Sequence, residues 1–194
     1  MSAHTIARLR IALLLVGVTV VQTALAADLR VAGVAPDLMV LTAILAGLAG
    51  GSEAGAVMGF FSGLLMDMFL ASTPVGLSAL TYCVIGAIVG AGRASVMPER
   101  SLVVPVSALF ATAAAVLMFV AFGEILGQGQ LLSAGHSWFA RVILVESGWN
   151  LVLSLPLGWL YARAARGSVG TDRFGLTLGL PRRRERLAGS LGIR

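Results

Sequence analysis

The chain has 194 residues, of which 58% are hydrophobic and only 12% are charged, and its mean hydropathy is +0.93. With its 24 glycines counted, the apolar fraction lies well above the roughly 45–50% of soluble domains. This composition excludes a soluble globular, disordered or collagen-like chain and indicates an integral membrane protein. The apolar stretches leave no room for a second soluble domain, and a single cysteine excludes an internal disulfide.

Crossing the hydrocarbon core of a bilayer takes about 20 apolar residues in a helix. We therefore expect an all-α, polytopic membrane protein with six transmembrane helices in one bundle. The predicted spans lie near residues 11–27, 38–50, 54–71, 75–92, 102–122 and 142–162. The second span is short, so a re-entrant segment is the alternative there, and the glycines before Glu53 separate it from the third.

The basic residues predict the orientation of these spans. All 14 are arginines, and loops that stay in the cytoplasm carry an excess of positive side chains. With both termini in the cytoplasm, 12 arginines lie inside, and Arg30 and Arg141 lie outside. Residues 1–162 then form the transmembrane domain, and residues 163–194 form a basic cytoplasmic tail that anionic lipids of the inner leaflet attract.

The first span also resembles a secretory signal. Arg8 and Arg10 precede an apolar run that ends in Ala24-Leu25-Ala26, a small-residue cleavage pattern. Cleavage would leave five spans and still keep the tail inside, so charge does not separate the two possibilities. The intact mass of the mature protein would.

A proline and a carboxylate open the second span. Pro36 and Asp37 come directly before the apolar run, where a carboxylate interacts favourably with the positive end of the helix dipole. We expect Asp37 to mark the first turn of that helix.

Small residues form regular rows on the next two spans. In the third span a glycine recurs every four residues and Asp67 continues the row, whereas the fourth span has a shorter notch. The rows are Gly51, Gly55, Gly59 and Gly63 in the third span, and Gly86 and Gly90 in the fourth. Such rows allow helix backbones to approach closely. They predict either packing within the bundle or a groove for a partner's helix.

Ionisable groups inside the spans form the second candidate set, because each is costly in a bilayer unless it is paired or hydrated. Asp67 and Glu146 lie at one depth near the outer side, and Asn150 continues the polar stripe of the last span. We expect Arg141 to pair with one of the two carboxylates. A general acid and base or a proton-coupled site is the alternative use of two carboxylates at one depth.

The motifs of common catalytic sites do not occur in the sequence. It has no His-Glu-x-x-His helix, no Gly-x-Ser-x-Gly turn and, having no lysine, no phosphate-binding Gly-x-x-x-x-Gly-Lys loop. We therefore expect no enzymatic activity, no cofactor and no metal. The basic excess follows from membrane orientation, so we also expect no binding of nucleic acid.

The order and spacing of four segments resemble the MreD family of rod shape-determining membrane proteins. These segments are Pro36-Asp37-Leu38, the run from Gly59 to Asp67, the run from Pro74 to Leu80, and Asn150 followed by Pro156. The resemblance covers residues 11–162. It implies a bacterial inner-membrane protein of the cell-elongation machinery whose partners are an MreC-like single-span protein, a RodA-type glycosyltransferase and its transpeptidase. MreB-like filaments are then indirect partners.

Two functions follow from this resemblance. The first is a non-enzymatic scaffold that assembles or regulates peptidoglycan synthesis proteins, with partner contact at the glycine rows. The family's six-helix bundle is also similar to the substrate-binding subunits of energy-coupling-factor vitamin transporters. A solute-binding subunit is therefore the alternative, although few aromatic residues are present to line a vitamin pocket.

Overall fold

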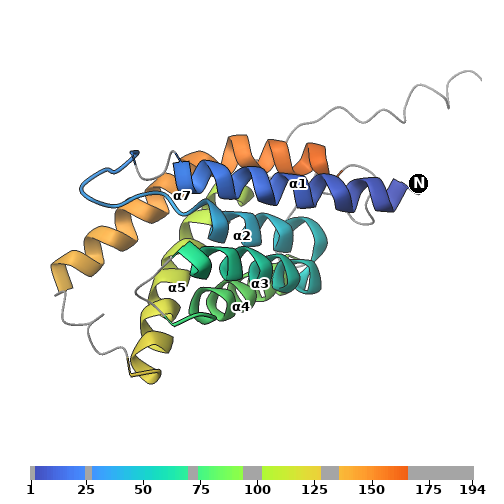
Figure 1. The fold of residues 1–194 in the computed structure, drawn as a ribbon. Coiled ribbons are helices and arrows are strands. Elements are labelled where there is room, and N and C mark those ends of the chain that lie inside the picture. Colours follow the sequence, from blue (N-terminus) through green and yellow to red (C-terminus); the bar gives the residue numbers. More distant parts are fainter. Residues whose placement is uncertain (1–2, 25–27, 70–73, 94–101, 128–135, 166–194) are drawn as a thin grey trace, which may run out of the picture.

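A computed structural model describes residues 3–24, 28–69, 74–93, 102–127 and 136–165 of the chain. Six helices occupy these residues (Figure 1): α1 (Ala3–Ala24), α2 (Leu38–Gly50), α3 (Ser52–Phe69), α4 (Leu77–Gly92), α5 (Val103–Ile125) and α7 (His136–Ala164). The same residues contain no strand beyond an isolated bridge between Val31 and Val34. The expected all-helical fold is confirmed.

Each helix overlaps one of the six apolar stretches of the sequence. Helix α2 has the expected bounds, but α1 begins at Ala3 and α7 begins at His136, earlier than the apolar runs do. Two helices are long and apolar enough to cross a membrane, Val103–Ile125 and Ser137–Ala164. Three shorter apolar helices accompany them, at Leu9–Ala24, Leu38–Gly50 and Leu77–Gly92. The supposed cleavage site after Ala26 and the tail from residue 166 lie outside the described residues.

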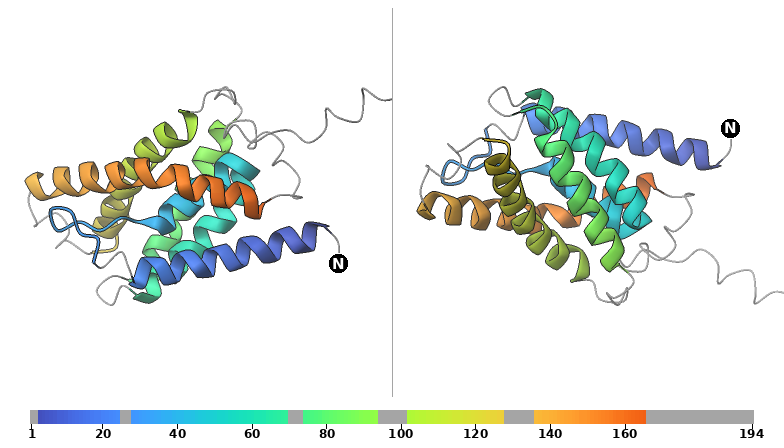
Figure 2. Two further views of the ribbon diagram at one scale, coloured as in Figure 1. Left: turned by 90° about the horizontal axis from the view of Figure 1, so that it is seen from above. Right: turned by 90° about the horizontal axis from the view of Figure 1, so that it is seen from below.

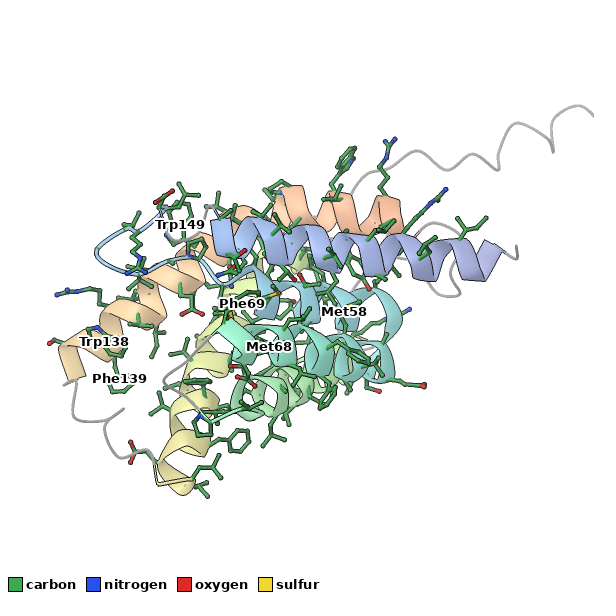
Figure 3. All side chains as sticks on the ribbon, viewed as in Figure 1. Met58, Met68, Phe69, Trp138, Phe139 and Trp149 are labelled. Carbon is green, nitrogen blue, oxygen red and sulfur yellow. The ribbon has the colours of Figure 1, made fainter. Side chains whose placement is uncertain are left out.

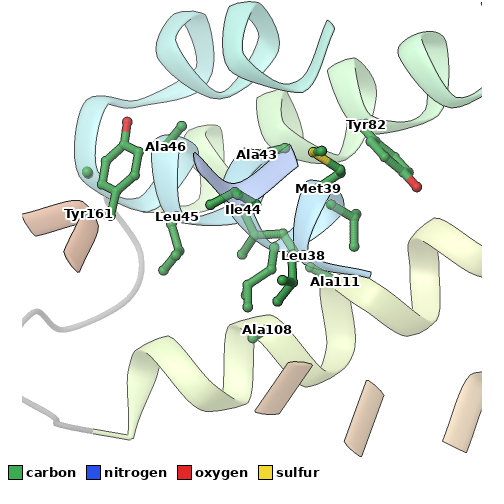
Figure 4. Packing of buried hydrophobic residues seen from close by; sticks show 14 of the residues in the cluster. Leu38, Met39, Ala43, Ile44, Leu45, Ala46, Tyr82, Ala108, Ala111 and Tyr161 are labelled. Carbon is green, nitrogen blue, oxygen red and sulfur yellow. The ribbon is translucent and has the colours of Figure 1, made fainter. Parts of the chain in front are cut away.

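Helix α2 lies at the centre of the bundle, surrounded by the other five helices (Figure 2). It is apolar all round, as fully enclosed helices are, and 11 of its 13 residues are buried. Figure 4 shows its side chains packed against Ala108 and Ala111 of α5, Tyr82 of α4 and Tyr161 of α7. At about 1.5 Å per residue α2 is only about 20 Å long. It is therefore too short to cross a 30 Å core alone.

Polar contacts with neighbouring helices satisfy both ends of α2. At its start, Gln22 of α1 donates to the carbonyl of Pro36 at 2.9 Å and accepts from the N–H of Leu38 at 2.8 Å. At its end, Arg93 donates to the carbonyl of Ala49 at 2.8 Å. Because a helix leaves its first N–H and last C=O groups unpaired, these contacts fix a short helix that could not satisfy its own ends.

Candidate functional site

The glycine rows meet inside the chain, between α3 and α4. A Cβ added at Gly55 would come closer than 3.0 Å to the carbonyl of Gly86, and one at Gly59 would clash in the same way with the backbone of Tyr82. A Cβ at Gly63 would meet the backbone of Ser78. The α3 row is therefore covered by the α4 backbone, and a partner's helix could reach it only if α4 moved away.

The other glycines of these rows extend the same contact. A Cβ at Gly90 would clash with the backbone of Gly51, which itself has φ +92° and ends α2. The sequence analysis did not include Gly47 of α2, whose Cβ would meet the carbonyl of Gly86 and the backbone of Gly90. Its spacing of four residues from Gly51 is the signal that could have found it. Three helices thus meet backbone to backbone at Gly47, Gly55 and Gly86.

Asp67 holds the start of α4. Its Oδ2 accepts from the N–H groups of Gly76 at 2.8 Å and Ala79 at 3.2 Å, and its Oδ1 accepts from the N–H of Ser78 at 3.0 Å. The residue is only 2% exposed. A carboxylate is well suited to the N-terminus of a helix, where backbone donors are unpaired. Here the carboxylate comes from α3, so its hydrogen bonds hold the end of α3 against the start of α4.

The expected ion pair of Arg141 is not formed within the described part of the chain. The oxygens of Asp67 are occupied by backbone donors, and Arg141 lies exposed on α7 without a bond to Glu146. At Asp67 the competing donors are main-chain groups, which a sequence does not reveal; the side chain of Arg141 is exposed and makes no bond to Glu146 in the described part of the chain.

Asp37 caps α2 and also links it to α4. Its Oδ1 accepts from the N–H of Met39 at 2.9 Å and of Val40 at 3.1 Å, and its Oδ2 accepts a hydrogen bond from the hydroxyl of Tyr82. The β-region backbone of Asp37 is that of an N-cap. The carboxylate that begins the central helix is thereby held by a second helix as well.

A cavity of about 230 Å³ lies beside this carboxylate, between α4, α5 and α7. Asp37, Ser78 and Tyr82 form its polar wall together with Glu146 of α7. The remaining lining is apolar or aromatic: Ala115, Val116, Phe119, Val120, Trp138, Phe139 and Val142. Figure 1 shows that α5 and α7 diverge toward this end of the bundle, and Figure 3 places Trp138 and Phe139 on the first turns of α7.

Two polar groups of this cavity lack a partner among the described residues. The Oγ of Ser78 is fully buried and makes no hydrogen bond, although the N–H of the same residue bonds to Asp67. Glu146 makes no hydrogen bond within the described part, so its carboxyl group stands free at the cavity. An unpaired buried hydroxyl is costly, and so is a carboxyl group without a partner inside a membrane protein. The arrangement can accept a hydrogen-bond donor or a cation.

The polar stripe of α7 is divided among different neighbours. Asn150 donates from Nδ2 to the hydroxyl of Thr112 on α5 at 3.0 Å, and both side chains are fully buried. Its Oδ1 has no partner among the described residues. Asn150 therefore joins α5 to α7, whereas Glu146 one turn earlier lines the cavity. The cavity brings Glu146 together with Asp37, a pair that the sequence analysis did not consider, and the common depth of Asp67 and Glu146 stays a prediction.

Comparison with known proteins gives one clear match. The family model of the rod shape-determining protein MreD matches residues 3–164 of this chain. Neither the curated proteins nor the solved structures gave a match. The matched range begins and ends with the six helices and leaves out the arginine-rich tail.

Proposed function

Since this chain belongs to the MreD family of rod shape-determining proteins, we propose that it is a non-enzymatic scaffold of the cell-elongation complex in the bacterial inner membrane. It assembles or regulates peptidoglycan synthesis proteins: an MreC-like single-span protein, a RodA-type glycosyltransferase and its transpeptidase. MreB-like filaments are reached indirectly through these partners. The family match over residues 3–164 is the observation that carries this proposal.

The proposed topology has six spans with both termini in the cytoplasm. The 12 arginines that this orientation places inside support it. Contacts between helix ends support it as well, because Arg93 at the end of α4 bonds to the end of α2, and Gln22 near the end of α1 bonds to the start of α2. Consecutive helices then run in opposite directions. Helix α2 forms the central core and does not contact lipid.

The partner's contact surface in this proposal is the cavity of about 230 Å³ beside Asp37, with the flanks of α5 and α7 that border it, since the glycine rows are already covered. We call this surface the wedge between α5 and α7. Its apolar lining suits a membrane-embedded helix, and its polar wall presents Glu146 and the hydroxyl of Ser78. In this proposal the transmembrane helix of the MreC-like protein packs against α5 and α7 beside the cavity, and one of its basic side chains near the outer membrane surface enters the cavity toward Glu146. An acidic cavity with an unpaired carboxyl group complements such a side chain.

The size of the cavity supports a side chain over a vitamin. Sites for drug-sized ligands enclose about 300–1,000 Å³, and this acidic cavity has about 230 Å³. A single long side chain fits that volume.

Substitutions at Glu146 test the proposal. We expect Glu146→Leu to lower recovery of the MreC-like partner with the purified protein by about tenfold or more, because it removes the carboxylate that accepts the basic side chain. Glu146→Gln keeps an acceptor but loses the charge, so recovery falls less. Glu53→Gln, an exposed carboxylate in the first turn of α3, is the matched control. Unchanged recovery with Glu146→Leu, at normal membrane levels, would contradict the assignment.

A further inference from the structure

A second and larger depression separates α1 from α7 on the opposite side of α2. Figure 2 shows the two helices side by side with α2 beneath them. The groove has a volume of about 940 Å³, and one face of each helix lines it. Its lining from α1 is Arg10, Leu13, Leu14, Gly17, Val18 and Val21, and its lining from α7 is Leu153, Pro156, Leu157, Leu160, Arg163 and Ala164, with Leu38 as floor.

The charges of the groove are confined to one end. Helices α1 and α7 are antiparallel, so Arg10 near the start of α1 and Arg163 near the end of α7 lie at the same end. Arg163 is held over the ring of Trp159, 5.6 Å from its centroid. All other lining residues are apolar. The groove is therefore cationic at one end and apolar along the rest of its length.

The dimensions of the groove match one leaflet of a bilayer. From Arg10 to Val21 the wall of α1 rises about 16 Å, and half of a hydrocarbon core is about 15 Å thick. The apolar walls match the acyl chains of a lipid in that leaflet, and the two arginines match its anionic headgroup.

We propose that this groove binds an anionic phospholipid of the inner leaflet, with its acyl chains along α1 and α7 and its phosphate between Arg10 and Arg163. Basic pockets between transmembrane helices on the cytoplasmic side bind anionic headgroups, and arginine binds phosphate through two parallel N–H groups. The site is independent of the partner contact at Glu146, which lies in the separate cavity between α4, α5 and α7. A lipid bound there contacts α1 and α7 at once and so holds α1 against the bundle.

Native mass spectrometry of the full chain in neutral detergent tests the site with two probes of equal acyl chains, palmitoyl-oleoyl phosphatidylglycerol and palmitoyl-oleoyl phosphatidylcholine. Each arginine close to an anionic headgroup contributes about a fivefold preference. We expect phosphatidylglycerol to bind about 30-fold tighter, and the double variant Arg10→Gln with Arg163→Gln to lose this preference. Arg141→Gln, an exposed arginine of α7 outside the groove, is the control and leaves it unchanged.

A second variant tests the groove itself. A Cβ at Gly17 would have no neighbour within 4 Å, so the ring of Gly17→Phe can obstruct part of the groove without a clash at its Cβ. We expect it to weaken both lipids at least tenfold while the circular dichroism spectrum stays unchanged. Equal affinity of the wild type for the two lipids would overturn the proposal. So would lipid binding that Gly17→Phe does not reduce, since the lipid would then lie outside the groove.

Discussion

At Gly59 the addition of one methyl group has a calculable consequence. The new Cβ would lie closer than 3.0 Å to backbone atoms of Tyr82 and Cys83, which cannot rotate away. We expect Gly59→Ala to destabilise the protein by about 1–3 kcal/mol through overpacking. Gly148→Ala on α7 meets nothing within 4 Å and should gain up to about 1 kcal/mol in helix stability. Unfolding in mixed detergent micelles measures both, and equal effects would contradict the close α3–α4 contact.

Asp67 provides a second prediction for a single residue. Asp67→Ala leaves the N–H groups of Gly76, Ser78 and Ala79 without their acceptor. We expect a loss of about 2–3 kcal/mol, since lost caps and charged hydrogen bonds have costs of this size. Arg141→Gln should stay within about 0.5 kcal/mol, as exposed substitutions do. A comparable loss of stability with Arg141→Gln would contradict this account, because it would indicate that Arg141 forms a stabilising ion pair.

For single residues, the sequence indicated which glycines and carboxylates take part in helix packing, but it did not indicate which groups they contact. The glycine spacing indicated close packing of helices. Gly86 and Gly90 have the same spacing as the α3 row, but the sequence does not indicate that α3 and α4 pack against each other. The partners of Asp67 are backbone groups, which every residue carries. The expectation of a charged partner for Asp67 therefore pointed to Arg141 and missed these backbone groups.

Between elements, the contact of α5 with α7 includes a buried polar pair. Asn150 donates to Thr112 in a region lined by small residues of α5, among them Ala108, Ala111 and Ala115. We expect a double-mutant cycle of Asn150→Leu and Thr112→Val to give a coupling free energy of about 0.6 kcal/mol, the average for such pairs in membranes, and at most about 1.7 kcal/mol. Thermal unfolding of the four proteins in one detergent gives the value. A coupling of zero would show that the two helices pack without this bond.

Hydropathy located all six helices but not all of their ends. Helix α2 ends where its apolar run ends, because Asp37 and Gly51 provide a cap and a left-handed residue there. Helix α1 continues through Arg8 and Arg10 to Ala3, since intrahelical hydrogen bonds do not require apolar side chains. Cap chemistry is visible in a sequence, whereas a helix that continues into polar residues is not.

For the whole molecule, the proposed topology predicts which positions a membrane-impermeant maleimide can reach. In a Cys83→Ala background, we expect single cysteines at Val75 and Ser137 to be labelled in intact cells. Cysteines at Ser52 and Gly92 should react only after permeabilisation. All four positions are exposed, and each lies within two residues of a helix end. Labelling of Ser52 from outside would contradict the placement of the α2–α3 break on the inner side.

The wedge between α5 and α7 was not predicted from the sequence. Its polar wall joins Asp37 and Ser78 to Glu146, three residues far apart in the chain that only the fold brings to one cavity. The family, by contrast, was visible in the order of short motifs along the chain, and the match over residues 3–164 confirms it.

Photocrosslinking in cells tests the scaffold account most directly. A photoreactive residue at Val116 or Val142 lies in the wedge, and one at Ile88, which is 58% exposed on α4, lies on another face. We predict crosslinks to the MreC-like single-span protein from Val116 and Val142, and none from Ile88. Crosslinks to that protein from Ile88 but from neither wedge position would contradict the account.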